Sequence, residues 1–480
     1  MSYSVAQNTS FLTIASIMQK IVSFVYFTIV ARIIGVGNTG SYFFAITFTT
    51  IFTVVADFGM GPILTREAAK FSNRVNDYMN TVLASKILFG IIAYFLVVFF
   101  VVILKYPLDL RNLILLSGVT MFFDNLQSNF FSIFRAQKDL VYESVAIVIS
   151  QILTMIIGTT ALLFHGSLIW LIAAYTIPSA IIVLYGAFFV KRVYHFRIRP
   201  MVDREIFKQF LLLALPFALA GLLGRLYSYS DSLIMSKLLT PQDLGWWSVP
   251  YKVTFAFQFI PAALSASVYP AMSSFTVTDP GKIGELFVRA WKYLFIIIFP
   301  LSLGLIAVAR PVIVRLYGVQ YLPSVPVFRI LLVSLFFSYL TIISGSLLNA
   351  TNHQKIQTGL IAIVLVVNVI LNLILIPKFG IIGAAYVALF SNILLWLLGL
   401  MFIRRVIVLP GQKLLRNAAH ILSLAIVMSV LVYLLTLHFS IILTIPIGAA
   451  VYGALLFLTG AIDPALLKNY LQRLNFKKIV

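Results

Sequence analysis

The stretch "RIIGVGNTGSYFFAITFTTIF", residues 32–52, is the most informative part of this 480-residue chain. Its glycines fit the G-x-G-x-x-G spacing of a dinucleotide-binding turn, which carries weight only between a short buried strand and a helix. Here the preceding apolar run has about 25 residues, enough for a membrane-spanning helix. The stretch therefore predicts a turn between two spans, not a nucleotide site.

A second copy of this stretch, "KLLTPQDLGWWSVPYKVTFAF", begins at residue 237. The offset is 237 minus 32, or 205 residues, and only the last glycine of the fingerprint recurs. Because Pro241-Gln242-Asp243 stands where Val36-Gly37-Asn38 stood, the position is expected to require a turn and not phosphate-binding glycines. The aligned pairs are Arg32 with Lys237, Gly40 with Gly245, Tyr42 with Trp247, and Phe52 with Phe257.

The repeat continues along the chain. "AAY" at 173–175 matches "AAY" at 384–386, and "FVKR" at 189–192 matches "FIRR" at 402–405. We therefore expect two parallel six-helix lobes, residues 1–200 and 201–412, followed by two more helices and a basic cytoplasmic tail in 413–480. Transporters are commonly built from such repeats, with the substrate site between the halves.

The composition predicts an all-α polytopic membrane protein, because 61% of the residues are hydrophobic and only 10% are charged, against about 25% charged in soluble proteins. Fourteen spans are predicted, each near the length that crosses a bilayer. They are 9–34, 41–63, 80–104, 112–134, 141–164, 168–190, 207–236, 243–268, 289–316, 324–348, 355–376, 381–403, 417–437 and 441–460.

The distribution of basic residues predicts the topology. With the N-terminus in the cytoplasm, 23 of the 35 Lys and Arg lie in cytoplasmic segments and eight lie outside. The even number of spans places the C-terminus in the cytoplasm as well. The net charge of +21 does not indicate nucleic-acid binding, since the basic residues occupy short gaps between apolar runs. Gln19 and Lys20 interrupt the first run and no cleavage site follows, so that helix is expected to remain.

Two stretches carry a family resemblance. Residues 31–71 resemble the opening of Wzx-type polysaccharide flippases, a family of the MOP superfamily that also contains MATE drug antiporters and lipid II flippases. The matching residues are Arg32, Gly35, Gly40, Tyr42, Asp57, Gly59, Arg66 and Glu67, followed in residues 215–254 by Pro216, Asp231, Gly245 and Tyr251. The resemblance implies a MATE-like V-shaped pair of lobes around a central cavity, and an oligosaccharide on a polyprenyl phosphate or diphosphate as cargo.

Two cations lie deep in predicted spans at matched positions. Lys20 and Arg225 lie near the middle of the first and seventh spans, and 225 minus 20 is again 205. A Lys or Arg at the bilayer centre costs about 2.5–3.5 kcal/mol on insertion scales, so it normally faces a cavity or a partner. We predict that this pair binds the phosphate of the cargo. The alternative is that each cation snorkels or pairs locally.

Other basic residues are weaker candidates for substrate binding. Lys86 lies about two turns from a helix end, where it could snorkel, and Lys252 follows Pro250, which can kink a helix. Arg32, Lys237 and Arg66 are rim or gate candidates, and the first two could equally be boundary anchors.

Three acids, Asp57, Asp124 and Asp231, lie in or near the spans. Asp124 belongs to the polar stretch "FFDNLQSN", which suits either a sugar-facing wall or helix packing by hydrogen bonds. Asp231 could pair with Tyr227, pair with a cation on another helix, or bind a coupling ion. Asp124 and Asp231 complete the predicted substrate-binding set.

The sequence thus predicts a flippase, not an enzyme, that carries a lipid-linked oligosaccharide across the cell membrane by alternating access. The alternatives are a MATE-type cation-coupled drug exporter and a membrane glycan polymerase or ligase. No cofactor or metal site is expected apart from a coupling ion, since the chain has no cysteine and its five His are scattered. A monomer is expected, working beside glycan polymerase or ligase machinery and binding no nucleic acid.

Overall fold

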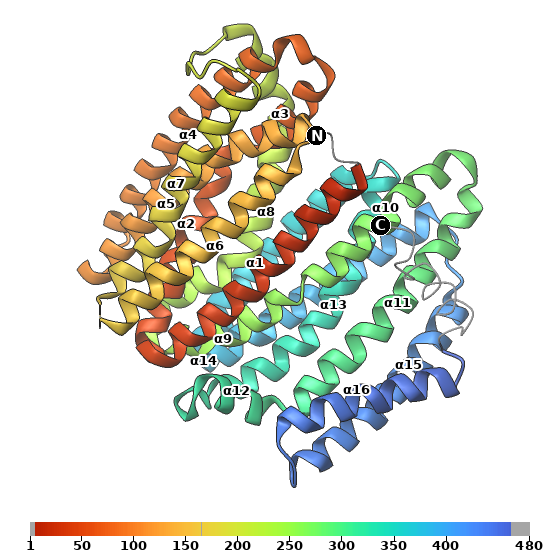
Figure 1. Ribbon diagram of the computed structural model, residues 1–480. Coiled ribbons are helices and arrows are strands. Elements are labelled where there is room, and N and C mark those ends of the chain that lie inside the picture. The colour runs from red at the N-terminus through yellow and green to blue at the C-terminus, as the bar shows by residue number, and fades with distance from the viewer. Residues whose placement is uncertain (1–4, 165, 462–480) are drawn as a thin grey trace, which may run out of the picture. The chain divides into compact units, whose positions relative to one another are not determined.

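The computed structural model describes residues 5–164 and 166–461, and this part of the chain forms helices and connecting segments without a β-strand (Figure 1). The chain divides into two compact units. The first comprises residues 1–248 with 372–381, and the second comprises 249–371 with 382–480.

The first unit is a bundle of long helices. Its helices are α1 (Val5–Ile34), α2 (Val36–Asp57), α3 (Met60–Lys70), α4 (Val75–Ile103), α5 (Leu108–Ala136), α6 (Leu140–Leu163), α7 (Leu168–Val193) and α8 (Arg204–Leu238), with a short 3₁₀ turn, Ser72–Arg74, before α4. The helix α5 packs against α4 and α7, and α1 packs against α6 (Figure 1). An apolar core at one end joins α3, α4, α5, α7 and α8.

The helix α9 (Pro241–Ala256) crosses the boundary between the units at Ser248. The remaining helices are α10 (Phe259–Thr278), α11 (Pro280–Ala307), α12 (Ala309–Tyr317), α13 (Ser324–Ala350), α14 (Gln354–Val406), α15 (Gly411–Thr436) and α16 (Ile441–Leu458), with a 3₁₀ turn at Val319–Tyr321. In the second unit, α11 packs against α13 and α15, and α15 packs against α16. The two helices beyond the sequence repeat therefore belong to the packing of the second unit.

The number of spans agrees with the prediction. Twelve stretches in the described residues are long and apolar enough to cross a membrane. One of them, α14, has 53 residues and bends at Gly380, where φ is 58°, so it contains two spans. The helix α5 is too polar to meet the same criterion, yet it is 29 residues long and packs among the spans. Counting both halves of α14 and adding α5 gives fourteen.

Several predicted boundaries were wrong. The predicted span 289–316 begins too late, because α11 begins at Pro280. It also contains a break, because α11 ends at Ala307 and α12 is a separate short helix. The predicted span 243–268 also contains a break, between α9 and α10, and α10 continues to Thr278. Hydropathy averages over such breaks, since the residues on both sides are equally apolar.

The turn predicted at residues 35–40 is shorter in the structure. Only Gly35, with φ of 81°, departs from helical geometry, and α2 begins at Val36. In the second copy, α9 begins at Pro241, the position where proline is preferred in a helix. Thr240 and Asp243 form a capping box: the Asp243 carboxylate accepts from the Thr240 amide at 3.0 Å, and the Thr240 hydroxyl accepts from the Asp243 amide at 3.3 Å.

The recurring glycines explain the repeat. A Cβ at Gly40 would lie 1.9 Å from the Pro241 carbonyl oxygen, and a Cβ at Gly245 would lie 2.0 Å from the Val36 carbonyl oxygen. The first turns of α2 and α9 therefore cross in direct backbone contact, reciprocally, at repeat-matched positions. No larger residue fits at either position without moving a helix. Gly40 recurs as Gly245 because of this close helix crossing.

Candidate functional site

The matched cations lie on exposed surfaces of two long helices. Lys20 on α1 and Arg225 on α8 are each roughly four turns from the nearer helix end, and both side chains are exposed. Apolar side chains at Ile17 and Ile21 flank Lys20 and are exposed as well. Beside Arg225, a Cβ at Gly224 would meet nothing within 4 Å, so that helix face is open.

Lys86 has a different environment, because its side chain is completely buried (0% exposed). Its ammonium group donates to Asp57 Oδ1 at 2.5 Å, to Ser128 Oγ at 2.5 Å and to the Asn125 carbonyl oxygen at 3.4 Å. These three acceptors use all three ammonium protons. Lys86 therefore neither snorkels nor points to solvent, and it holds α2, α4 and α5 together.

The Asp57-Phe58-Gly59 sequence forms the break between α2 and α3. Asp57 ends α2 and pairs with Lys86, with 33% of its side chain exposed. Phe58, with φ of 48°, stacks on Phe89 of α4 at 5.1 Å between ring centroids. Gly59 has φ of 72°, and a Cβ there would lie 3.0 Å from the Ala214 carbonyl oxygen of α8. Each residue of this motif therefore has a structural role at the break.

The polar stretch of α5 makes contacts on two sides. Asp124 Oδ1 accepts from the Ser179 hydroxyl of α7 at 2.6 Å and from Gln127 at 2.8 Å. The Asn125 amide donates to the Lys86 carbonyl oxygen of α4 at 3.0 Å. Asn129 is fully buried, and both of its amide atoms lack a hydrogen-bond partner within the described residues. Polar side chains of this stretch thus form hydrogen bonds to neighbouring helices, while the Asp124 side chain itself is exposed.

Asp231 is buried on α8 and accepts a hydrogen bond from the Asn372 amide of α14 at 2.5 Å. Sequence reasoning did not consider an amide partner, because residue 372 lies 141 positions away. Lys252 lies on α9 in the second unit with an intermediate exposure. The α9 helix continues through Pro250 and ends at Ala256, so the chain breaks six residues after Pro250 and not at Pro250 itself.

The rim candidates also differ from each other. Lys237, at the end of α8, donates to the Leu104 carbonyl oxygen and lies 3.4 Å above the Tyr106 ring centroid, a cation–π contact. The Tyr106 hydroxyl lies 2.9 Å from Ser236 Oγ. Lys237 therefore fastens the end of α8 to the α4–α5 connection. Its counterpart Arg32 is exposed at the end of α1.

Arg66 lies on α3 and donates to Glu67 Oε1 at 2.8 Å, while Lys70 lies 3.6 Å from the same oxygen. Glu67 is buried and both basic side chains are largely exposed. A similar arrangement joins α5 to α6, where Arg135 forms a bidentate pair with the buried Glu143. Arg66 thus belongs to a set of ion pairs at helix ends.

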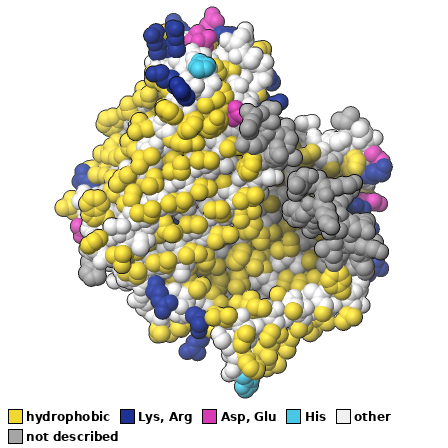
Figure 2. Space-filling view, viewed as in Figure 1, with side chains coloured by type: hydrophobic (Ala, Val, Ile, Leu, Met, Phe, Trp, Pro, Cys, Tyr) yellow, Lys and Arg dark blue, Asp and Glu magenta, His cyan; other side chains and the backbone are white. Residues whose placement is uncertain are grey.

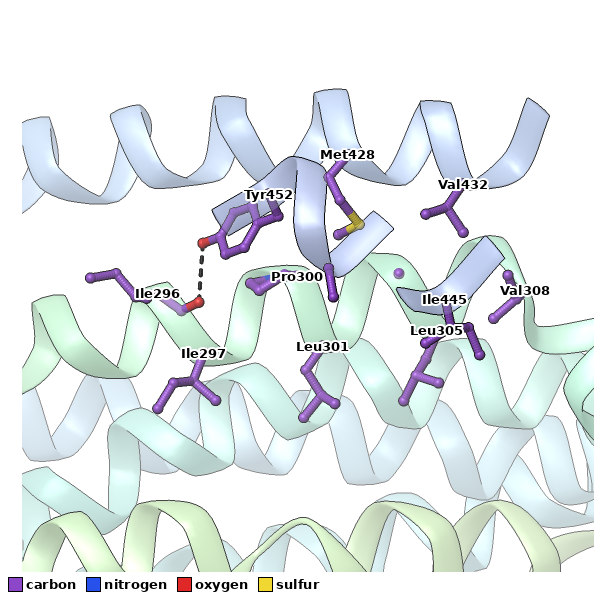
Figure 3. A pocket seen from close by; sticks show the side chains of 12 residues that line it. Ile296, Ile297, Pro300, Leu301, Leu305, Val308, Met428, Val432, Ile445 and Tyr452 are labelled. Carbon is purple, nitrogen blue, oxygen red and sulfur yellow. Dashed lines mark hydrogen bonds between the residues drawn. The ribbon is translucent and has the colours of Figure 1, made fainter. Parts of the chain in front are cut away.

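The second unit contains an apolar cavity of about 390 Å³ between α11, α15 and α16 (Figure 3). Pro300 has no amide proton, so the Ile296 carbonyl oxygen loses its usual helical donor. The Tyr452 hydroxyl of α16 donates to that oxygen at 3.0 Å instead (Figure 3). The remaining lining is almost entirely hydrocarbon: Ile297, Leu301, Gly304, Leu305, Val308, Met428, Val432, Ile445 and Ala449. Sequence reasoning missed this cavity, because hydropathy does not show where helix packing leaves space.

The fourteen spans, the repeat and the charges inside the bundle define the class as a polytopic all-α transporter, with no three-residue cluster of metal-binding side chains among the described residues. The sequence model described as "Polysaccharide biosynthesis protein" matches residues 5–276, more than half of the chain. The chain therefore belongs to the polysaccharide biosynthesis protein family. The model of the lipid II flippase MurJ matches residues 251–447.

Individual relatives agree with this assignment. The chain is 30% identical over 171 residues to the probable flippase AglR of Haloferax volcanii, covering 34% of this chain and 35% of AglR. It is 22% identical to the capsular polysaccharide biosynthesis protein CapF of Staphylococcus aureus, covering 79% of this chain and 94% of CapF. A solved structure of the lipid II flippase MurJ in an inward closed conformation has a TM-score of 0.75 at 20% identity, covering 92% of this chain and 97% of that chain. The protein is a multi-pass membrane flippase of glycan biosynthesis, a transporter and not an enzyme.

Proposed function

We propose that this flippase carries an oligosaccharide linked to a polyprenyl phosphate or diphosphate from the cytoplasmic to the outer leaflet by alternating access. Family membership supports a cargo from glycan assembly. The single observation that carries the proposal is the pair Lys20 and Arg225. They are exposed cations in the middle of apolar helices, at repeat-matched positions. An anionic phosphate is the ligand that such a pair suits best.

The phosphate site is proposed to exclude Lys86. Three protein acceptors already use its ammonium protons, and its side chain has no exposed area. Recruiting Lys86 to a ligand would leave Asp57 without its cation. Asp124, Asp231 and Lys252 remain proposed cargo contacts, and Asp124 is the best placed of the acids because its side chain is exposed.

The hydrocarbon tail of the lipid carrier needs an apolar environment throughout transport. We assign part of the tail to the cavity between α11, α15 and α16, because that cavity is lined by hydrocarbon (Figure 3). Filling it with Ala449→Phe should slow transport of the lipid-linked glycan. Thermal stability should change little, because the new ring occupies empty volume.

Alternating access requires contacts that close one side and later separate. Two contacts are suited to this role: the crossing of α2 and α9 at Gly40 and Gly245, and the contact of Lys237 with Leu104 and Tyr106. Both lie at helix ends on the predicted outer side. The MATE-type drug exporter is less well supported. Such a protein needs acids available to cations, whereas of the three acids in or near the spans Asp57 is bonded to Lys86, Asp231 to Asn372, and Asp124 to Ser179 and Gln127.

The membrane potential can contribute to the driving force. Two negative charges that move outward across a negative-inside membrane gain about 2.3 kcal/mol per charge per 100 mV. The proposed cycle uses this gain for net export and assigns no step to a cofactor or a metal, and ion coupling stays open. Both termini are proposed to be cytoplasmic and the transporter monomeric, with glycan polymerase or ligase machinery acting after it.

The function is tested with purified protein in liposomes that contain a fluorescent polyprenyl diphosphate oligosaccharide in the inner leaflet. The proposal expects potential-dependent appearance of the sugar on the outside, and no transport of cationic drugs. Drug transport without sugar transport would favour the MATE-type alternative. Because the chain has no cysteine, the crossing can be tested in the same assay. A Cβ at Gly37 would lie 3.7 Å from Gln242 Cγ, so a disulfide between Gly37→Cys and Gln242→Cys should block transport when oxidised and restore it when reduced.

A further inference from the structure

The segment of residues 194–203 connects α7 to α8 and has no helix or strand, yet it is held firmly in place. The Asn76 side chain accepts from the Arg197 amide at 2.9 Å. Asn80 donates to the Arg197 carbonyl oxygen at 2.8 Å and accepts from the Arg199 amide at 2.8 Å. Both asparagines lie in the first two turns of α4. We call this segment the strap.

Alternate residues of the strap face opposite ways. Phe196 and Ile198 are half-buried and pack on the apolar core at this end of the first unit, whereas His195, Arg197 and Arg199 are exposed. His195 has φ of 57°, in the left-handed region, and from Phe196 to Arg199 half-buried and exposed side chains alternate. Arg197 and Arg199 are thus presented side by side from a backbone that the asparagines have fixed.

The strap lies within a larger basic surface. Figure 2 shows Lys and Arg side chains gathered at the end of the first unit. Six exposed cations on the strap and the adjoining helix ends make no ion pair within the described part of the chain: Lys191, Arg192, Arg197, Arg199, Arg204 and Lys208. Of the nearby acids, Asp203 caps α8 by accepting from the Glu205 and Ile206 amides, at 2.9 and 3.0 Å. Positive charge therefore dominates this surface.

Two apolar side chains interrupt the charges. Met201 is 74% exposed and Val202 is 51% exposed, between Arg199 and Arg204. Neither side chain belongs to the apolar core on which Phe196 and Ile198 pack. Exposed apolar residues flanked by cations are the pattern of a surface that lies in a membrane interface.

We propose that the strap binds the anionic phospholipid headgroups of the leaflet on its own side of the membrane. Arg197 and Arg199 contact neighbouring lipid phosphates, because guanidinium groups bind phosphate through two hydrogen bonds, and Met201 and Val202 insert among the acyl chains. An acidic protein would explain the cations but not the exposed apolar pair. This surface would act as a lipid anchor for the first unit whichever cargo the flippase carries.

The test measures stabilisation of the purified full-length chain in a neutral detergent by phosphatidylglycerol and, separately, by phosphatidylcholine. A ligand that binds the folded state raises its melting temperature. We expect phosphatidylglycerol to stabilise the wild type more than phosphatidylcholine does. The Arg197→Gln/Arg199→Gln variant should bind phosphatidylglycerol about 30-fold more weakly, since each basic residue near an anionic surface contributes about fivefold. Arg310→Gln/Arg329→Gln removes two exposed cations from the second unit and serves as a control of equal charge.

The proposal is overturned if the control weakens binding as much as the strap variant does, or if the strap variant binds like the wild type. Equal stabilisation by inorganic phosphate or by polyglutamate would show a general anion site and would also overturn it. A second measurement uses a variant that keeps all the basic residues of the strap. Met201→Cys introduces the chain's single cysteine, and an environment-sensitive fluorophore there should report an apolar environment in phosphatidylglycerol nanodiscs and water in phosphatidylcholine nanodiscs. The same spectrum in both would contradict insertion.

Discussion

Lys86 and the pair Lys20 and Arg225 show two ways in which a membrane protein uses a cation. Lys86 is fully buried and its three protons bind protein oxygens from α2 and α5. Lys20 and Arg225 lie on exposed helix faces far from the helix ends. Hydropathy treats all three as charges in a span. The environment separates a charge that holds helices together from a charge on an exposed helix face.

The largest predicted effect is the loss of transport when Arg225 is replaced. Replacing Arg225 with Gln should lower the rate of glycan export about 100-fold, because a charge-assisted contact to phosphate contributes on the order of 2–3 kcal/mol. The melting temperature should stay within a few degrees of the wild type, since the side chain is exposed. Export is measured in liposomes and stability by thermal unfolding. A large loss of stability would move Arg225 into the same group as Lys86.

Lys86 should show the opposite behaviour. Lys86→Met leaves the Asp57 carboxylate without its cation and should destabilise the protein by about 3 kcal/mol, the lower end for a broken buried pair because Asp57 is one-third exposed. Transport per folded molecule should remain near the wild-type value. Denaturation in a mild detergent measures the first quantity, and export normalised to folded protein measures the second. Wild-type stability of this variant would contradict the packing role.

The matched control removes both charges of the pair. Asp57→Asn with Lys86→Gln keeps the size and much of the hydrogen bonding, and leaves no isolated charge. We expect it to recover most of the stability lost in Lys86→Met, to within about 1 kcal/mol of the wild type. If the double variant is as unstable as the single one, the Lys86 side chain stabilises the protein by something other than its pair with Asp57.

The smallest effect is expected for an exposed ion pair. Asp279, before α11, lies 2.8 Å from Lys282, and both side chains are largely exposed. The hydrogen bond from Lys282 lowers the pKa of the Asp279 carboxyl below its ordinary value of 3.8. A lowered folded-state pKa gives stability that is present above pH 4 and is lost as the pH falls through the folded-state pKa. Asp279→Asn should therefore shift the melting temperature by only about 1 °C at pH 7. A shift as large as that of Lys86→Met would contradict the difference expected between an exposed and a buried ion pair.

The sequence was sufficient to predict the all-α class, the fourteen spans and the matching of Gly40 with Gly245. It could not show why Gly40 recurs. The reason is that α2 and α9 cross there in backbone contact, and a sequence does not show how closely two backbones approach. It placed Lys86, Lys20 and Arg225 in one set of substrate-binding candidates. The acceptors that separate Lys86 from the others come from residues 29 to 42 positions away, on other helices.

Local patterns in the sequence also mark two of these elements. The capping box Thr240-Pro241-Gln242-Asp243 marks the start of α9 at Pro241, where the prediction placed a turn. In the strap, the alternation of Phe196 and Ile198 with Arg197 and Arg199 indicates a segment with one packed face and one exposed face. The partners of the strap, Asn76 and Asn80, are more than 115 positions away and could not be read from the sequence.

The central claim is that Lys20 and Arg225 bind the phosphate of the cargo, and the most direct test is export by the Lys20→Ala/Arg225→Ala variant. Purified variant and wild-type proteins are reconstituted at equal density in liposomes with fluorescent polyprenyl diphosphate oligosaccharide, and the appearance of sugar outside is followed. The account predicts that the variant inserts and folds like the wild type but exports no glycan above the protein-free background, while Lys20→Arg retains part of the rate because the charge remains. Export at the wild-type rate by the correctly folded double variant would contradict the account.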